Sequence, residues 1–198
     1  EKVKEIKLAI ASLDTMNPIL SNNKNVQDIS KLIYEPLVNL TSDYKAQPCL
    51  AKEWAKQSDN SYLIKLRENV RWSDGQRFTS EDVKFTLDRL KDTKTIYSSN
   101  VQNVVGIDII DDYTIKINLD KEVPFFEYYL TFPILSKDYY EGEEFVNSSK
   151  NTSPVGTGKF KITEVQPSYI ILEKNNSWWN KEKEFTLEKI TVNLYSSI

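Results

Sequence analysis

The sequence predicts an α/β fold, and three patterns along the chain support this. A run with apolar residues at every second position, typical of a half-buried strand, opens the chain, and an apolar run lies near its end. Between them, two segments carry apolar residues at helical spacing. Turn-forming residues separate most of these runs, and 198 residues, 39% of them hydrophobic, are enough to bury a substantial core. We therefore expect a globular chain in which strands and helices alternate.

The first third of the chain predicts a strand, a helix and further strands. Val3 to Ala11 alternates apolar and polar residues, and a loop follows at residues 14–18. Apolar residues fall at helical spacing from Asn25. Pro36 disfavours the α conformation at Glu35, so this helix is expected to end there. The next expected elements are a short strand over Leu37 to Leu40, one helical turn through Ala51, Trp54 and Ala55, and a strand over Tyr62 to Leu66.

The middle of the chain carries the clearest helix. Ser73 to Gln76 predicts a turn, because glycine tolerates positive φ and aspartate can bond its own backbone. Thr79 and Asp82 then match a capping pattern, which predicts a helix from Ser80 to Leu90. The later expected elements are a hairpin of Val105 to Ile110 with Tyr113 to Leu119, a short helix over Pro124 to Tyr129, a loop at Ser153 to Gly158, paired strands over Phe160 to Val165 and Tyr169 to Lys174, and a strand over Ile190 to Tyr195.

The composition excludes several classes of function. The net charge of −3 comes from 26 basic and 29 acidic residues that are interspersed, so nucleic acid is not an expected partner. The chain has no histidine, which removes the commonest general base and the commonest zinc ligand. Cys49 is the only cysteine and is expected to pack as a small apolar residue. We expect no enzyme activity, no metal site and no cofactor.

The N-terminus and the hydropathy of the chain show no targeting pattern. No stretch approaches the ~20 apolar residues of a membrane helix. No succession of charged, apolar and small residues marks a signal peptide at the N-terminus. The sequence is therefore expected to be that of a mature or trimmed chain.

Three features allow a functional interpretation but favour a structural one. Asp108, Asp111, Asp112 and the acids of residues 138–144 lack the spacing of a calcium loop, and such runs are usually solvated faces. The glycines of residues 156–158 lack the longer pattern of a phosphate loop, which favours a structural turn. Four tryptophans and 11 tyrosines are expected mostly in the core, although a cleft that accepts varied apolar side chains remains open.

Several stretches resemble one protein family. Residues 51–74, reading AKEWAKQSDNSYLIKLRENVRWSD, resemble the signature segment of the family 5 extracellular solute-binding proteins, the oligopeptide, dipeptide and nickel binders of ABC importers. The turn and capped helix of residues 72–85, the turn of residues 153–158 and the aromatic segment of residues 175–179 resemble further parts of that family. These similarities run over nearly the whole chain in family order.

The resemblance implies a periplasmic-binding-protein-like lobe with a mixed sheet that carries the first and last strands. Residues 1–40 and 152–198 are expected to form the main subdomain of lobe I, and residues 41–151 an inserted α+β subdomain. Family members are longer, and in them the equivalent of Ile190 to Ser197 leads into a second lobe. That lobe, with the acid that meets the amino end of a peptide, is expected to be absent from this sequence.

The resemblance also implies the function. The expected activity is capture of short peptides outside the cytoplasmic membrane for delivery to an ABC permease, with closure of two lobes on the ligand. The protein is expected at the cell surface as a lipoprotein or in the periplasm, with membrane association only through a lipid anchor absent from this chain. A nickel or metal-chelate binder of the same family is the near alternative, and a hydrolase or a sensory or adhesion module is less favoured.

Four residues are the candidate ligand contacts. Thr15 and Met16 lie in the loop that aligns with a ligand-facing segment of dipeptide-binding relatives. A methionine suits a permissive pocket because its side chain is flexible and polarizable, but Met16 is as well explained as a core residue. Tyr34 and Tyr97 are chosen because the resemblance places their segments near the cleft and their hydroxyls can reach a peptide group.

Overall fold

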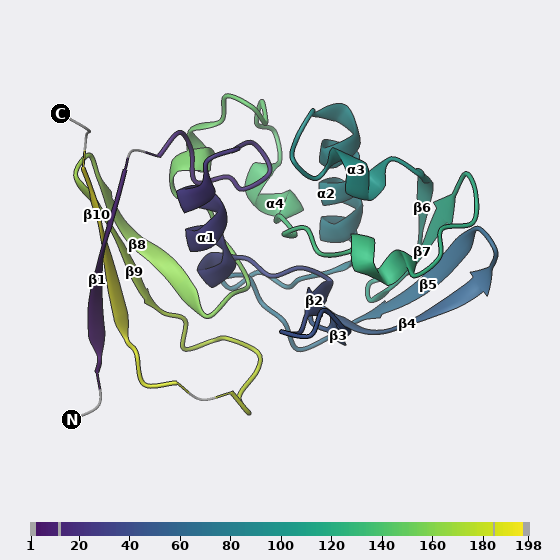
Figure 1. The fold of residues 1–198 in the computed structure, drawn as a ribbon, viewed down its shortest axis with the longest axis horizontal. Coiled ribbons are helices and arrows are strands. Elements are labelled where there is room, and N and C mark those ends of the chain that lie inside the picture. The colour runs from purple at the N-terminus through teal and green to yellow at the C-terminus, as the bar shows by residue number, and fades with distance from the viewer. Residues whose placement is uncertain (1–2, 12, 184, 196–198) are drawn as a thin grey trace.

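The computed structural model describes residues 3–11, 13–183 and 185–195. Two four-stranded sheets lie at opposite ends of the molecule, and most of the helices lie between or above them (Figure 1). In chain order, the elements are β1 (Glu5–Ile10), α1 (Lys24–Ile33), β2 (Val38–Leu40), β3 (Ala46–Pro48), β4 (Ala51–Ser58), β5 (Ser61–Leu66), α2 (Ser80–Asp92), α3 (Ser98–Val101), β6 (Val104–Asp111), β7 (Thr114–Leu119), the 3-10 helix η1 (Phe126–Tyr129), α4 (Lys137–Tyr140), the 3-10 helix η2 (Ser149–Thr152), β8 (Phe160–Gln166), β9 (Tyr169–Lys174) and β10 (Lys189–Leu194).

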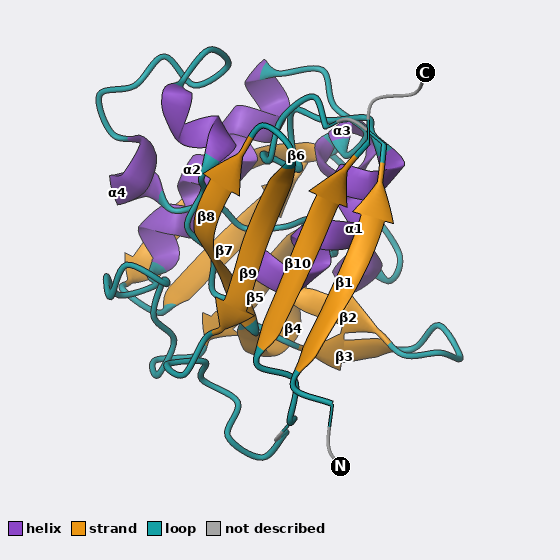
Figure 2. Ribbon diagram, turned by 90° about the vertical axis from the view of Figure 1, so that its left-hand side faces the viewer, coloured by secondary structure: helices purple, strands orange, loops and turns teal. Residues whose placement is uncertain are grey.

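The first sheet has the strand order β1-β10-β9-β8 and is mixed, as predicted. β1 pairs in parallel with β10, from Glu5 opposite Lys189 to Ile10 opposite Leu194, whereas the other pairs are antiparallel. Figure 2 shows that no helix covers the outer face of this sheet, and α1 packs on the other side against β8. The proposed division at residues 40/41 and 151/152 stays a prediction, and residues 196–197 lie outside the described part of the chain.

The second sheet has the order β4-β5-β7-β6, with all pairs antiparallel. The predicted hairpin is confirmed as β6 and β7. Its turn lacks glycine, and the Tyr113 N–H instead donates to the Asp111 carboxylate at 2.8 Å, which stabilises the reversal. The helix α2 packs on this sheet, with Leu87 and the sheet residues Ile64 and Ile115 fully buried.

The prediction of a helical turn through Ala51, Trp54 and Ala55 is wrong, because these residues form β4. The three-residue spacing of Ala51 and Trp54 resembled a helix, but it comes from a β-bulge. The register shifts between Ala51 and Glu53, so Ala51 faces Leu66 while Trp54 faces Ile64 two positions earlier on β5. The bulge adds one residue to the usual two-residue period and brings both side chains to the same face of the sheet.

Short elements complete the fold and were not predicted. β3, α3, α4 and η2 span only three or four residues each, too few to produce a periodic pattern. The expected helix of residues 124–129 is present as the shorter 3-10 helix η1. Cys49 is 3% exposed and packs in the core, as expected. In the described part of the chain, no helix is both long enough and apolar enough to cross a membrane.

Candidate functional site

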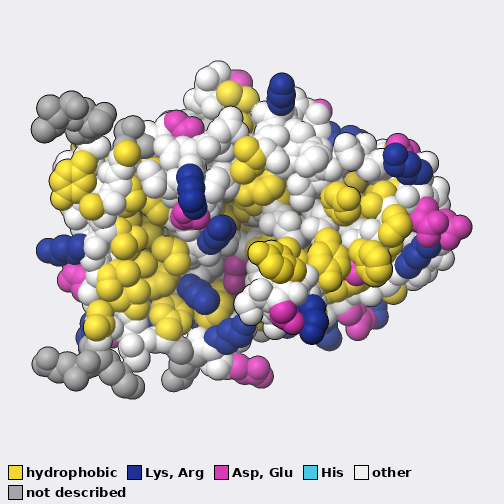
Figure 3. Space-filling model, in the orientation of Figure 1, with side chains coloured by type: hydrophobic (Ala, Val, Ile, Leu, Met, Phe, Trp, Pro, Cys, Tyr) yellow, Lys and Arg dark blue, Asp and Glu magenta, His cyan; other side chains and the backbone are white. Residues whose placement is uncertain are grey.

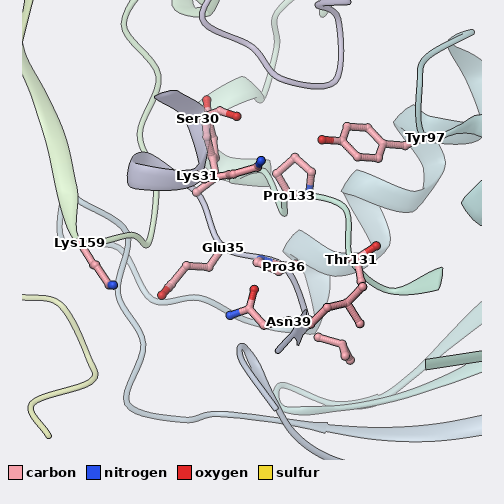
Figure 4. A pocket seen from close by; sticks show the side chains of 12 residues that line it. Ser30, Lys31, Glu35, Pro36, Asn39, Tyr97, Thr131, Pro133 and Lys159 are labelled. Carbon is pink, nitrogen blue, oxygen red and sulfur yellow. The ribbon is translucent and has the colours of Figure 1, made fainter. Parts of the chain in front are cut away.

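A hollow of about 500 Å³ opens between the C-terminal half of α1, the strand β2 and the segment that follows η1 (Figure 4). It lies between the two parts of the molecule that carry the four-stranded sheets. Figure 3 shows Lys and Arg side chains in the middle of this face, between the hydrophobic side chains over the first sheet and those farther along the molecule. The residues that line the hollow are Ser30, Lys31, Tyr34, Glu35, Pro36, Val38, Asn39, Leu40, Tyr97, Thr131, Pro133 and Lys159.

The end of α1 places Glu35 in the wall of this hollow. The helix ends at Ile33, and Tyr34 already has extended backbone angles, in agreement with the effect predicted for Pro36. The loop of residues 156–158 packs directly under this end, where the Gly158 N–H donates to the Ile33 carbonyl at 2.8 Å. The two glycines of this loop allow that close approach, so the Gly-Thr-Gly segment acts as a structural turn.

Glu35 is a buried carboxylate that is held by three donors. The Trp178 indole N–H donates to Oε1 at 2.9 Å, while the Trp179 indole N–H and the Thr157 hydroxyl donate to Oε2 at 2.7 and 3.0 Å. Burial raises the pKa of Glu35, and these hydrogen bonds and the nearby charge of Lys159 oppose that change. Both carboxylate oxygens therefore serve to fix the wall of the hollow.

A smaller hollow of about 90 Å³ adjoins the first and shares Glu35, Asn39 and Lys159 with it. Cations and indole rings meet here. The Arg67 guanidinium lies 4.4 Å from the Trp179 ring centroid, and the Lys159 ammonium lies 5.3 Å from that of Trp178. These distances are in the range of cation–π contacts, so the aromatic segment holds positive charge at the edge of the site.

Two of the four predicted contacts line the larger hollow. Tyr34 is 3% exposed, and Tyr97 is half-buried with its hydroxyl donating to the Gln27 side chain at 2.7 Å. Thr15 and Met16 lie outside it. Met16 is 3% exposed and belongs to the hydrophobic core, which agrees with its alternative interpretation as a core residue, and its contact with ligand stays a prediction.

The sequence patterns did not identify Glu35 or Lys159 as site residues. A signal for Glu35 was present, since it is a lone acid within the apolar run of residues 32–38. Such an acid is either exposed at a helix end or buried with partners, and the sequence does not show which. Lys159 has no comparable local signal. Its place follows from the packing of the preceding turn under α1.

The site is built for binding. Its carboxylate already accepts three hydrogen bonds from the protein, and in the described residues no group of three or more acidic or cysteine side chains is arranged to hold a metal ion. The lining combines aromatic rings, prolines and a few polar groups, which is typical of a site for a small organic ligand.

Comparisons with known proteins identify related chains. Residues 45–197 match the family model described as "Bacterial extracellular solute-binding proteins, family 5 Middle". The chain is 26% identical to the periplasmic murein peptide-binding protein MppA of Escherichia coli K12, over 96% of this chain and 39% of the relative. It is 28% identical to the glutathione-binding protein GsiB of Escherichia coli O1:K1, over 89% of this chain and 35% of the relative.

A solved structure agrees with this match. NikZ from Campylobacter jejuni, in complex with Ni(L-His), superposes with a TM-score of 0.84 at 25% identity, over 98% of this chain and 39% of that one. The chain thus spans about two fifths of the length of the proteins that it matches. The mixed α/β architecture, with two four-stranded sheets and the two-stranded sheet of β2 and β3, matches that part of the relatives' fold.

Proposed function

The chain belongs to the bacterial extracellular solute-binding proteins, family 5, and from this premise we propose that it captures short peptides for an ABC importer. Capture takes place outside the cytoplasmic membrane, and the loaded protein delivers the peptide to a membrane permease. A lipid anchor beyond this chain or a periplasmic location would keep it near that permease. No catalytic step belongs to this function.

The observation that carries the proposal is the position of β2 beside the hollow. β2 pairs with β3 on one side, and in the described residues no further strand pairs with it, although the Val38 N–H donates to the Leu130 carbonyl at 3.0 Å. Val38, Asn39 and Leu40 line the hollow, so the rest of the main chain of this strand lies next to a space of about 500 Å³. An extended peptide bound there gains main-chain hydrogen bonds that do not depend on its sequence. Two relatives whose names state peptide and glutathione binding support this ligand class.

The proposal includes a second lobe that closes over the hollow. The chain spans about two fifths of the length of its relatives, so a further lobe is consistent with their size. Residues 1–40 and 152–198 would form the main subdomain of the first lobe and residues 41–151 its insert. Hinge closure between lobes would then exclude water from the bound peptide.

A nickel chelate is the alternative ligand. A structure with 25% identity to this chain contains Ni(L-His), and the basic and aromatic residues around the hollow can hold a chelate without coordinating the metal themselves. The chain has no histidine to supply as a ligand. A hydrolase, or a sensory or adhesion module, has no observation in its favour here.

Calorimetric titration of the whole gene product tests the proposal. A pool of di- to pentapeptides and, separately, Ni(L-His) are titrated into the wild type, an Asn39→Ala variant and a matched Asn193→Ala variant on the outer sheet face. We expect peptide binding that is weakened by Asn39→Ala and unchanged by Asn193→Ala. If the nickel chelate binds and no peptide does, the peptide assignment is refuted, whereas the assignment of the fold stands. Turnover of chromogenic peptide or glycoside substrates would refute the binding function.

A further inference from the structure

The charged side chains around the two adjoining hollows are mostly cationic. Lys31 and Lys159 line the larger hollow, and Lys159 and Lys183 line the smaller one. Glu35 is the one carboxylate in these described linings. Arg67 adds a further positive charge beside Trp179. The ligand therefore meets a wall in which cations outnumber anions.

The one carboxylate is largely occupied by donors of the protein. Glu35 accepts from the two indoles and the Thr157 hydroxyl, which fill three of its roughly four acceptor positions, and the residue is 9% exposed. Displacing Trp178, Trp179 or Thr157 would leave a buried donor without a partner, which is costly. The accessible charge of the site is thus that of its lysines.

Lys159 is the lysine best placed to meet a ligand. Its side chain is exposed and lines both hollows, and Figure 4 shows it pointing across the space toward Glu35. In the described part of the chain, no hydrogen bond or ion pair holds its ammonium, which lies 5.3 and 6.0 Å from the ring centroids of Trp178 and Phe185 and whose charge also acts on Glu35. Lys31, by contrast, is paired with Asp28 at 3.3 Å.

We infer that Lys159 binds a carboxylate of the ligand, so that the site selects solutes with an anionic group near the hollow. The inference rests on the proposed function and narrows its ligand class. A carboxylate can form a charge-assisted hydrogen bond to the ammonium, which is stronger than a bond between neutral groups. The carboxylate comes either from the C-terminus of a peptide or from an acidic side chain, and the two sources share this chemistry.

Four tripeptides separate the two sources. Ala-Glu-Ala and Ala-Gln-Ala, each with a free and an amidated C-terminus, are titrated into the whole gene product by calorimetry. The tryptophan fluorescence is followed in parallel, because Trp178 adjoins Lys159. Lys159 binds either the C-terminal carboxylate or that of the glutamate side chain, and we expect loss of the one that it binds to weaken peptide binding about tenfold. Lys159→Gln should remove this difference, and Lys161→Gln, at a position of β8 that lines neither hollow, should retain it.

The outcomes distinguish the inference from the proposed function. Equal binding of all four peptides, with no effect of Lys159→Gln, overturns the inference and leaves peptide capture in place. If no peptide binds, the proposed function fails, and N-acetylglutamate is then compared with N-acetylglutamine. Binding of the acid that is lost in the Lys159→Gln variant supports the role of Lys159, whereas equal or absent binding of the two compounds overturns it.

Discussion

Substitution of Gly156 by alanine tests how the loop under α1 builds the wall of the hollow. A Cβ atom at this position would lie 1.9 Å from the Ile33 carbonyl oxygen, 2.7 Å from its carbonyl carbon and 2.9 Å from its Cγ2. Two of these three atoms belong to the backbone of the last residue of α1 and cannot rotate away. The loop must therefore move away from the helix.

The expected loss of stability follows from the contacts that this movement breaks. Forcing a methyl group into a packed site costs about 1–3 kcal/mol. The Gly158 N–H to Ile33 hydrogen bond, at 2.8 Å, adds about 1 kcal/mol if it is broken. The Thr157 hydroxyl bond to Glu35 is strained by the same shift. We expect Gly156→Ala to lower the free energy of unfolding by roughly 2–4 kcal/mol.

Urea unfolding of the whole gene product, followed by tryptophan fluorescence, measures this loss, because Trp178 and Trp179 share Glu35 with the loop. The matched control is Gly106→Ala in β6, where an added Cβ meets no atom within 4 Å. The control should stay within about 0.5 kcal/mol of the wild type. If Gly156→Ala unfolds at the same urea concentration as the control, the close approach of the loop to α1 does not stabilise the fold.

Three further predictions concern buried polar groups. Burial raises the pKa of Asp82 to about 6 from 3.8, so between these values the folded state holds a proton that the unfolded state has lost. The free energy of unfolding should therefore fall by up to about 3 kcal/mol as the pH rises from roughly 4 to 6. Urea unfolding across this range checks the sign, and Asp82→Asn should flatten the slope; a slope that the variant retains would assign it to another group. Cys49 is 3% exposed, and burial raises the pKa of its thiol. An aromatic disulfide reagent should therefore label Cys49 only when urea has unfolded the protein. Labelling of the native protein would contradict this packing. Glu35→Gln turns an amide N–H group toward indole or hydroxyl donors and should lower the free energy of unfolding by about 1–3 kcal/mol. The control Glu53→Gln loses only an exposed ion pair with Lys65 and should change it by less than about 1 kcal/mol. Equal thermal stability of the two variants would show that the contacts of Glu35 do not stabilise the fold.

Elements with a local cause were predictable from the sequence. The helix α1 follows from the spacing of Val26, Ile29 and Ile33 and from Pro36 beyond its end. The β6–β7 hairpin follows from two runs of strand-forming residues, the second of them alternating, around an acidic turn. The strand β4 was not predictable in the same way, because a bulge broke the two-residue period that identifies a strand.

The site was only partly predictable, for a different reason. Tyr34 and Tyr97 were assigned by resemblance, and both line the larger hollow. Glu35 obtains its role from partners 122 to 144 residues away, and no local pattern connects such positions. The contacts of Thr15 and Met16 with ligand stay predictions; in the fold the Thr15 hydroxyl bonds to the carbonyl of Asn151, and Met16 is packed in the core. Resemblance to a related chain indicates which segment lies near the ligand, whereas the contacts within the fold decide which side chains of that segment face it.

The parallel pairing of β1 with β10 also has a consequence for the order of events during translation. β1 is synthesised well before its neighbour in the sheet, because the strand beside it ends at Leu194. At about 5–20 residues per second, roughly 10 to 40 seconds pass before that partner has been synthesised. Throughout this interval β1 has no strand beside it and its Ile6, Leu8 and Ile10 lack their sheet neighbours, so a chaperone that shields residues 5–10 should raise the yield of folded protein.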